Sequence, residues 1–292
     1  MPQVLCIGQA VLDCITRGKE LTPYKPNVYR AETIRLHIGG NAVNESTALA
    51  AMGIDAAIAC GLGHDVAGDL LFNALNAAGV DTSRVSRPPI DTPIANLQVS
   101  LDGSRVSVNS NATRLEGYRV DPSVVKGAKL VSLASLFRPP LADFDVIRAL
   151  IQAAKAEGAV LCADTKLPLT GDLTLEPLRD VLPLIDYIFP NEKEAAYYTG
   201  KTSLPDMARV LNDQGLRNVI IKADPEGCYV SGEGGAYPLP AVPVENVVDT
   251  TGAGDNFVAG FIAALLKNEP LRACAEAGLQ QAARAITHTG GA

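Results

Sequence analysis

The sequence predicts a three-layer α/β protein, with helices on both faces of a mainly parallel central sheet and a small β-sheet lid beside it. Short apolar runs alternate with helical patterns along the chain, as in folds whose parallel strands are joined by helices. Two stretches instead alternate polar and apolar residues, which is typical of a sheet with one buried face. The 292 residues, 47% of them hydrophobic, suffice for one large domain with a small appendage.

The elements of the central layers are read from apolar runs and helical spacing. Residues 4–7 are expected to form a buried strand, and 41–52 a helix that ends at Gly53, where a left-handed cap is favoured. Residues 56–60 follow as a strand and 66–78 as a second helix. Further strands are expected at 130–133, 160–163, 187–189 and 219–221, with helices at 142–156, 191–199, 204–214 and 256–266.

The lid is expected from residues 14–37 and 92–110. Asp102-Gly103, between two alternating runs, is a strong hairpin signal. We interpret both stretches as one antiparallel sheet that stands off the main domain; an extra hairpin on the main sheet is the alternative. A half-exposed sheet needs cover from substrate, a second subunit or both, so a homodimer through the lid is expected. The main domain would then comprise residues 1–13, 38–91 and 111–292.

Composition excludes several classes of protein. The formal net charge is −7 and Lys and Arg form no run, so a nucleic-acid binder is not expected. The six cysteines lack C-x-x-C spacing and the three histidines lack metal-ligand spacing, which favours core thiols in a reducing cytoplasm and no zinc site. Neither a membrane span nor a signal peptide is predicted.

The strongest chemical signal is the run Asp249-Thr-Thr-Gly-Ala-Gly-Asp255, directly before a helical pattern. Gly252, Ala253 and Gly254 predict a tight turn that opens the helix. Glycines let the backbone approach an anion closely, and free N–H groups at a helix N-terminus attract it. The run therefore predicts a phosphate cradle, although it is not a Walker A loop.

Asp255 has two interpretations on this pattern alone. A carboxylate at the mouth of the cradle would repel phosphate, but it would serve as a general base that faces an incoming hydroxyl. Aspartate is also favoured at helix N-termini as a cap. The local pattern leaves both open.

Four motifs together resemble one known family. The segment Asp249-Thr-Thr-Gly-Ala-Gly-Asp255-Asn-Phe-Val-Ala-Gly-Phe261 resembles the C-terminal signature of the ribokinase-like (PfkB) carbohydrate kinases, and Gly39-Gly-Asn-Ala-Val-Asn44 with the residues up to Gly53 resembles their N-terminal signature. Asn191-Glu-Lys-Glu194 is similar to their N-x-x-E motif, and residues 219–230 correspond to their nucleotide loop. The matches occur in the family's order along the whole chain.

The resemblance implies an ATP- and Mg²⁺-dependent kinase with a sugar under the β lid. Asp255 would be the base, and the amides of Gly252, Ala253 and Gly254 would stabilise the transferring phosphoryl group. Glu194 would help to place Mg²⁺ through water, and Asn191 would lie near the nucleotide phosphates. From the residues alone, a helix capping box is the favoured interpretation of Asn191 and Glu194.

The resemblance also implies a substrate pocket. Asp13 would bind sugar hydroxyls, since a carboxylate accepts two of them well. Gly39, Gly40 and Asn44 would line the same pocket, although the glycines also suit a plain loop-to-helix turn. Asn96 and Asn109 on the lid are further candidates, but alternation does not tell which face each side chain takes.

Other positions concern cations and phosphates. Asp249 and Thr251, with carbonyls of Ala285 and Gly290, match positions that bind a monovalent cation, usually K⁺, in many relatives; a structural loop is the alternative. Lys222 and Gly227 belong to the nucleotide loop. Lys166, where relatives often have Asn, is a candidate phosphate contact.

The function expected is therefore phosphorylation of a hydroxyl on a sugar or sugar-like molecule, as in ribokinase, fructokinase and sugar-acid kinases. A nucleoside kinase and a catalytically silent sugar-binding regulator on the same fold are alternatives. A nicotinamide dehydrogenase is discounted because the run from Gly61 to Asp65 lacks the third glycine of the dinucleotide fingerprint. The sequence does not name the substrate.

Overall fold

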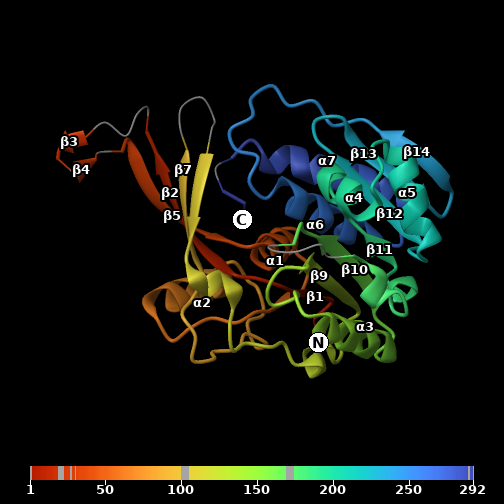
Figure 1. Cartoon of the computed structure of the whole chain (residues 1–292), viewed down its shortest axis with the longest axis horizontal. Helices are drawn as coiled ribbons and strands as arrows, with labels where there is room; N and C mark the ends of the chain where they lie inside the picture. Colours follow the sequence, from red (N-terminus) through yellow and green to blue (C-terminus); the bar gives the residue numbers. More distant parts are fainter. Residues whose placement is uncertain are drawn as a thin grey trace.

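The computed structural model describes residues 2–18, 23–26, 28–29, 31–99, 105–168, 174–288 and 290–291. Its centre is an eight-stranded sheet in the order β14-β13-β12-β11-β10-β9-β1-β6, and a separate four-stranded sheet has the order β5-β2-β7-β8. In Figure 1 the smaller sheet projects from one end of the layered body. The predicted fold class is confirmed.

Six strands of the central sheet run parallel and two form an antiparallel edge. The parallel part comprises β6 (Ala56–Ala59), β1 (Val4–Ile7), β9 (Leu130–Leu136), β10 (Val160–Thr165), β11 (Tyr187–Ile188) and β12 (Asn218–Ala223). The edge is the hairpin of β13 (Gly227–Gly232) and β14 (Gly235–Leu239), which the apolar pattern did not predict. All residues of β1, β6 and β9 are buried, because helices cover both sides of these strands.

The helices form one layer on each face. One layer holds α3 (Phe144–Ala156), α4 (Glu192–Thr199) and α5 (Leu204–Asp213), which share an apolar cluster with Leu5 and Ile7 of β1. The other holds α1 (Asn41–Ala51), α2 (Val66–Ala77), α6 (Ala253–Leu265) and α7 (Leu271–Ala285), with Val4 and Cys6. Short 3₁₀ turns lie at Asn111–Arg114, Pro122–Val125, Glu176–Leu178 and Leu182–Leu184. None of the described helices is both long and apolar enough to span a membrane.

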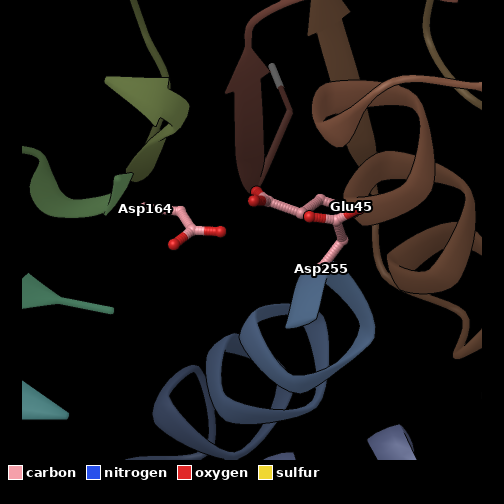
Figure 2. Close-up of side chains that lie close together, drawn as sticks. All are labelled: Glu45, Asp164 and Asp255. Carbon is pink, nitrogen blue, oxygen red and sulfur yellow. The ribbon is translucent and has the colours of Figure 1, made fainter. Parts of the chain in front are cut away.

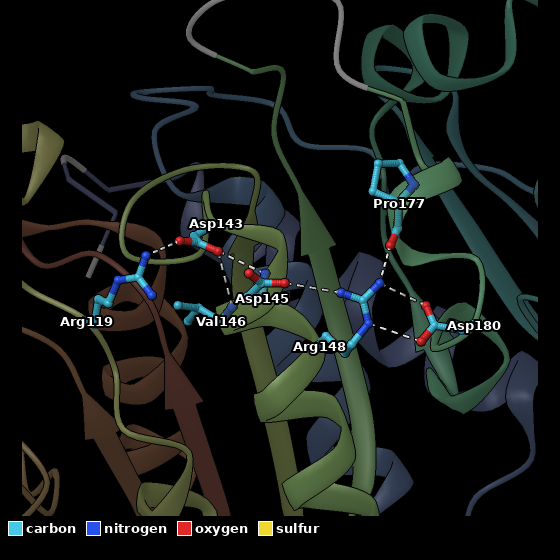
Figure 3. Close-up of polar contacts among 7 residues, drawn as sticks. All are labelled: Arg119, Asp143, Asp145, Val146, Arg148, Pro177 and Asp180. Atoms are coloured by element: carbon cyan, nitrogen blue, oxygen red, sulfur yellow. Dashed lines mark hydrogen bonds and ion pairs between the residues drawn. The ribbon is translucent and has the colours of Figure 1, made fainter.

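Polar side chains fix several helix starts. The Asp143 carboxylate caps α3 by accepting from the amide of Asp145 at 2.8 Å, and Arg119 pairs with the same carboxylate. One turn on, Arg148 contacts Asp145 and Asp180 (Figure 3). This surface network anchors α3 to the segment after β10, far from the glycine-rich motif.

The smaller sheet comprises β2 (Val11–Arg17), β5 (Thr33–Gly39), β7 (Ile94–Val99) and β8 (Arg105–Asn109). β2 is antiparallel to β5 but parallel to β7, which corrects the expectation of an antiparallel sheet. The reason is that the chain passes through the main domain between β5 and β7 instead of making a hairpin. A two-stranded piece, β3 (Pro23–Lys25) with β4 (Val28–Tyr29), lies beyond it. The expected turn at Asp102-Gly103 lies outside the described residues.

Strand register assigns the two faces of this sheet. Asp13 is opposite His37 and Ala95, and Ala95 is opposite Asn109, so these residues share one face. The opposite face carries Leu36, which is 55% exposed, and Val108, which is 60% exposed.

Candidate active site

The chemistry-bearing residues meet at the carboxyl end of the central parallel strands, the usual ligand side of open α/β sheets. Asp164 lies near the end of β10 and Lys222 near the end of β12. Helices α1 and α6 pack against each other, and their N-terminal turns bring Asn44 and Asp255 together. Residues more than 200 positions apart therefore share one site.

Asp255 is 6% exposed and is held by two amides of α1. Nδ2 of Asn41 donates to Oδ1 at 2.6 Å, and Nδ2 of Asn44 donates to Oδ2 at 2.6 Å. Burial raises the pKa of Asp255 above its ordinary value, against the charge of Lys166 and the Asn44 hydrogen bond. A carboxylate has about four acceptor positions, so both oxygens can still accept from a further donor.

Two more carboxylates lie beside it. Ligand oxygens of Glu45, Asp164 and Asp255 are all within 4.8 Å of one another, and Figure 2 shows the three side chains converging from three elements. Ser132 donates to Glu45 at 2.6 Å, but complete burial raises the pKa of Glu45 well above its ordinary value. Oδ2 of Asp164 is buried and has no partner among the described residues.

Two lysines balance this negative charge. Nζ of Lys222 donates to Oδ1 of Asp164 at 2.8 Å, and Lys222 is 7% exposed. Burial disfavours the charged form of Lys166, yet Asp164 and Asp255 outweigh it and hold the pKa of Lys166 above its ordinary value. The Lys166 ammonium group is therefore charged beside the candidate base.

The glycine run begins α6 as predicted. Gly252 precedes the helix at φ 73°, and no side chain caps the first turn. A Cβ on Gly252 would lie 2.5 Å from Cα of Gly291, and one on Gly254 would lie 3.3 Å from Nζ of Lys222. The backbone, its uncapped amides and an ammonium group thus converge on one point, which suits an anion.

A cavity of about 860 Å³ extends from Asp255 over the start of α6. All the predicted nucleotide contacts line it, namely Lys166, Asn191, Lys222, Gly227, Gly252 and Gly254. Its far wall is apolar and includes Val242, Val247, Leu279 and Ile286. Val247 is 55% exposed and Val242 39% exposed, so the wall presents bare apolar surface to a ligand.

Asn191 and Glu194 form the capping box that the residues alone favoured. The Asn191 side chain accepts from the amide of Glu194, while Glu194 Oε2 accepts from the amide of Asn191, both at 2.9 Å. Glu194 Oε2 also accepts from Oγ1 of Thr165 at 2.9 Å. Both Glu194 oxygens are engaged, because Oε1 accepts from Nδ2 of Asn191 at 2.8 Å.

Of the predicted substrate residues, Asn44 contacts Asp255, and Gly39 and Gly40 pack closely against the segment that leads into β2 and against β2 itself. A Cβ on Gly39 would be only 2.1 Å from Oδ2 of Asp13, and one on Gly40 would be 2.3 Å from the carbonyl oxygen of Gln9. These glycines therefore allow a close approach that no other residue permits. Burial, and then the charge of Asp249, raise the pKa of Asp13 to about 6.

The two lid asparagines take opposite faces. Asn109 shares the face of Asp13 and is exposed, whereas Asn96 pairs with Cys14 and Val108 on the far face. The structure therefore does not bring Asn96 to Asp13, because successive side chains of a strand alternate between faces. We leave Asn96 out of the pocket.

The candidate cation residues gather around Asp249. Oδ1 of Asp249 accepts from the amide of Thr251 at 2.9 Å and from its hydroxyl at 2.7 Å, and Oδ2 accepts from the amide of Gly290 at 3.1 Å. Arg17 of β2 forms an ion pair with Oδ2 at 3.6 Å. Ala285 ends α7, and its carbonyl oxygen accepts from the amide of His288 at 3.2 Å.

Sequence reasoning missed four residues of this region: Asn41, Glu45, Asp164 and Arg17. Asn41, Asn44 and Glu45 have helical spacing of three and four, which places them on one face of α1. Asp164 follows an apolar run at the carboxyl end of a strand, which was a usable signal. Nothing local singled out Arg17, because its partner is 232 positions away in a loop.

Three comparisons with known proteins agree. A family model described as pfkB family carbohydrate kinase matches residues 1–292. Ribokinase of Haemophilus influenzae is 28% identical over 267 residues, which cover 89% of this chain and 84% of that protein. ATP-dependent ribose-1-phosphate kinase of Halopiger xanaduensis is 31% identical over 269 residues, or 91% and 86% of the two chains. Arabidopsis thaliana ribokinase complexed with ribose and ATP has the same fold, with a TM-score of 0.83 at 23% identity over 99% and 94% of the chains.

Proposed function

The chain belongs to the pfkB family of carbohydrate kinases, and on that premise we propose that it transfers the γ-phosphate of ATP to a hydroxyl of a sugar or sugar-like molecule. One observation carries the proposal: Asp255 lines the cavity that holds the nucleotide candidates, and it also accepts a hydrogen bond from Asn44, a substrate candidate on α1. A nucleotide on one side and a hydroxyl on the other would meet at this carboxylate.

In this mechanism Asp255 accepts the proton of the attacking hydroxyl. Its buried position and raised pKa make it a stronger base than an exposed aspartate. Asn41 and Asn44 fix its orientation, since each donates to a different carboxylate oxygen. Asp13 accepts from other hydroxyls and holds the substrate in line.

The phosphates would lie over the start of α6. The amides at 252–254 donate to the charge that develops during transfer, and Lys222 and Lys166 add positive charge. The bare apolar wall of Val242 and Val247 suits the adenine ring. Phosphoryl transfer needs alignment and charge neutralisation more than covalent help, and this arrangement supplies both.

The residues present also fit Mg²⁺. Oδ2 of Asp164 is a buried oxygen that lacks a partner among the residues described, so it can serve as a ligand. Glu194 has both oxygens engaged and would act through water. When bound, the ion neutralises phosphate charge during transfer.

The proposal extends to a homodimer through the outer face of the lid. Ile34, Leu36, Val106 and Val108 are 55–65% exposed on the two outer strands of that face. Such a concentration of bare aliphatic side chains is typical of an interaction surface.

The six cysteines, all free, suit a reducing cytoplasm.

A release assay for ADP over a panel of substrates tests the function. The panel holds ribose, ribose 1-phosphate, fructose, sugar acids and nucleosides, because the relatives' names span sugars and a sugar phosphate. Wild-type protein is expected to turn over at least one member. Sugar binding without turnover of any member would instead favour the silent regulator.

The Asp255→Asn variant tests the base. Removing a general base lowers kcat by about two to four orders of magnitude, while ATP binding measured by calorimetry stays unchanged. Asp213→Asn, an exposed carboxylate on α5, is the matched control and keeps full activity. A variant within about tenfold of the wild-type kcat contradicts the assignment.

A further inference from the structure

Asp249 is a carboxylate held by three hydrogen bonds and one ion pair from the chain itself. Its side chain is 11% exposed; Thr251 occupies Oδ1 with two donors, and Gly290 and Arg17 approach Oδ2. Burial alone would raise the pKa of Asp249, but the hydrogen bonds from Thr251 and Gly290 and the charge of Arg17 lower it below its ordinary value. Asp249 is therefore an ionised group with a partner from the chain on each oxygen.

Two of the expected oxygen ligands of a monovalent cation, the Asp249 carboxylate and the Ala285 carbonyl, thus already accept hydrogen bonds from the chain. Both oxygens of Asp249 have donors, and the carbonyl of Ala285 closes a turn with the amide of His288. The positive charge that would complete this loop is present on the chain, because a guanidinium is ionised at any working pH. Within the described residues, Asp249 is the only carboxylate in ion-pair distance of Arg17.

We propose that the Arg17 guanidinium takes the place of the monovalent cation in this protein. Arg17 then acts as a positioning residue for phosphoryl transfer, an inference that rests on the proposed kinase function. Arg17 is connected to the anion cradle through few contacts. It pairs with Asp249, Asp249 holds Thr251 through two hydrogen bonds, and Gly252, the next residue, begins the amides of the cradle.

The ion pair also joins the two halves of the site. Asp13 and Arg17 alternate onto the same face of β2, so one strand presents the substrate carboxylate near its start and the cation at its end. Asp249 belongs to the loop before α6. Breaking the pair would therefore loosen the cradle and release the lid strand from it at once.

The test compares wild type with Arg17→Met in KCl, NaCl and tetramethylammonium chloride at equal ionic strength. Wild type is expected to show the same kcat/KM and the same Tm in all three salts. The variant should lose roughly a hundredfold in kcat/KM in sodium, because the cradle is misplaced. Part of the loss should return with K⁺ or with millimolar guanidinium, and K⁺ should raise the variant's Tm.

Two further variants keep the outcome clear. Arg17→Lys preserves the charge and should keep salt-independent melting even if Arg17→Met folds poorly. Arg35→Met changes an exposed arginine on the same lid face and should alter neither rate nor salt response. A purely structural role of Arg17 would lower Tm without creating a response to K⁺.

Activation of wild type by K⁺ over Na⁺, or an Arg17→Met variant with unchanged rate and unchanged salt response, overturns the proposal. Melting needs no substrate, so it separates this inference from the kinase function. If no substrate turns over, salt-independent melting of wild type with K⁺-dependent melting of the variant still supports Arg17. Raised melting of wild type in K⁺ refutes it.

Discussion

Asp13 shows how one glycine sets the properties of a binding carboxylate. The backbone of Gly39 lies so close to Asp13 that any Cβ would overlap its Oδ2 atom. The contact helps to bury the carboxylate, and burial, followed by the Asp249 charge, raises its pKa to about 6 from an ordinary 3.8. Because the folded-state pKa is the higher one, this group favours the fold below pH 4 and loses that contribution as pH rises through 6.

Substrate affinity should follow the same titration in the opposite sense. The ionised carboxylate accepts two hydroxyl groups, so the Kd for the sugar is expected to rise about tenfold between pH 7.5 and pH 5. Calorimetry without ATP measures this directly. Asp13→Asn should bind weakly at both pH values; a variant that keeps the pH dependence would show that another group causes it.

At the residue scale, a site residue could be predicted from the sequence where its partners are adjacent to it in the chain. Asp255 and the glycines before it were recognisable because the proposed anion cradle and the proposed base are adjacent in the chain. Glu45 is buried beside Asp164 and Asp255 by tertiary packing, and its helical position alone gave it no chemical meaning. Asn96 shows what an alternating sequence pattern cannot predict. The pattern tells which residues share a face of the sheet, but only the strand pairing, here Asn96 with Cys14, tells which face it is.

At the scale of elements, the start of α6 depends on a left-handed residue. Gly252 has φ 73°, and a side chain there would also overlap Gly291. Gly252→Ala is expected to displace the cradle and lower kcat by about a hundredfold. The conformational penalty alone is about 1–2 kcal/mol.

Gly79→Ala separates the cost of a positive φ from the steric displacement expected at Gly252. Gly79 has φ 79° but open space around it, so its substitution carries only the conformational penalty. Its Tm should fall by roughly 2–4 °C per kcal/mol, with unchanged kcat. Equal kcat in the two variants would show that the cradle tolerates the displacement.

Elements with strong periodicity were predicted within a few residues, and the exceptions have physical causes. Helix α7 begins after Pro270 without a capping side chain, and its buried stripe is made largely of small residues, Cys274, Ala275 and Gly278, so it was not recognised. The β13–β14 hairpin was hidden because its start, Gly227, was assigned to a nucleotide loop. The parallel β2–β7 pair joins distant segments, and no local pattern reports the direction of such a pairing.

At the scale of the whole molecule, the two outer strands of the smaller sheet expose aliphatic side chains on one face. In the two rows of opposed residues on this face, the middle strands carry Cys14, Asn96, Thr16 and Gln98, mostly polar, and the outer strands carry aliphatic side chains. A partner that contacts both edges would cover the aliphatic side chains together. A second copy of the chain brings the same edges with it, which suits a symmetric pair.

Sedimentation equilibrium tests this arrangement. Wild type should be dimeric, and Leu36→Lys combined with Val108→Lys should shift it to monomer, because two buried ammonium groups per copy oppose association. Val66→Lys, at a residue that is 84% exposed outside the lid, should remain dimeric. Monomeric wild type at all concentrations would contradict the proposal.

The close contact between Gly40 and Gln9 has a mechanical consequence. The two chain connections of the lid, one before β2 and one after β5, touch at this point, where a Cβ on Gly40 would meet the Gln9 carbonyl at 2.3 Å. If the smaller sheet tilts, it tilts about this contact, and β2 extends away from it. Arg17 lies roughly 13 Å further along the strand than Asp13, so a tilt of the sheet that barely moves Asp13 carries the guanidinium through a much larger arc. A tilt about this contact would therefore stretch the Arg17–Asp249 ion pair before it displaced Asp13, so that pair limits how far the sheet can tilt.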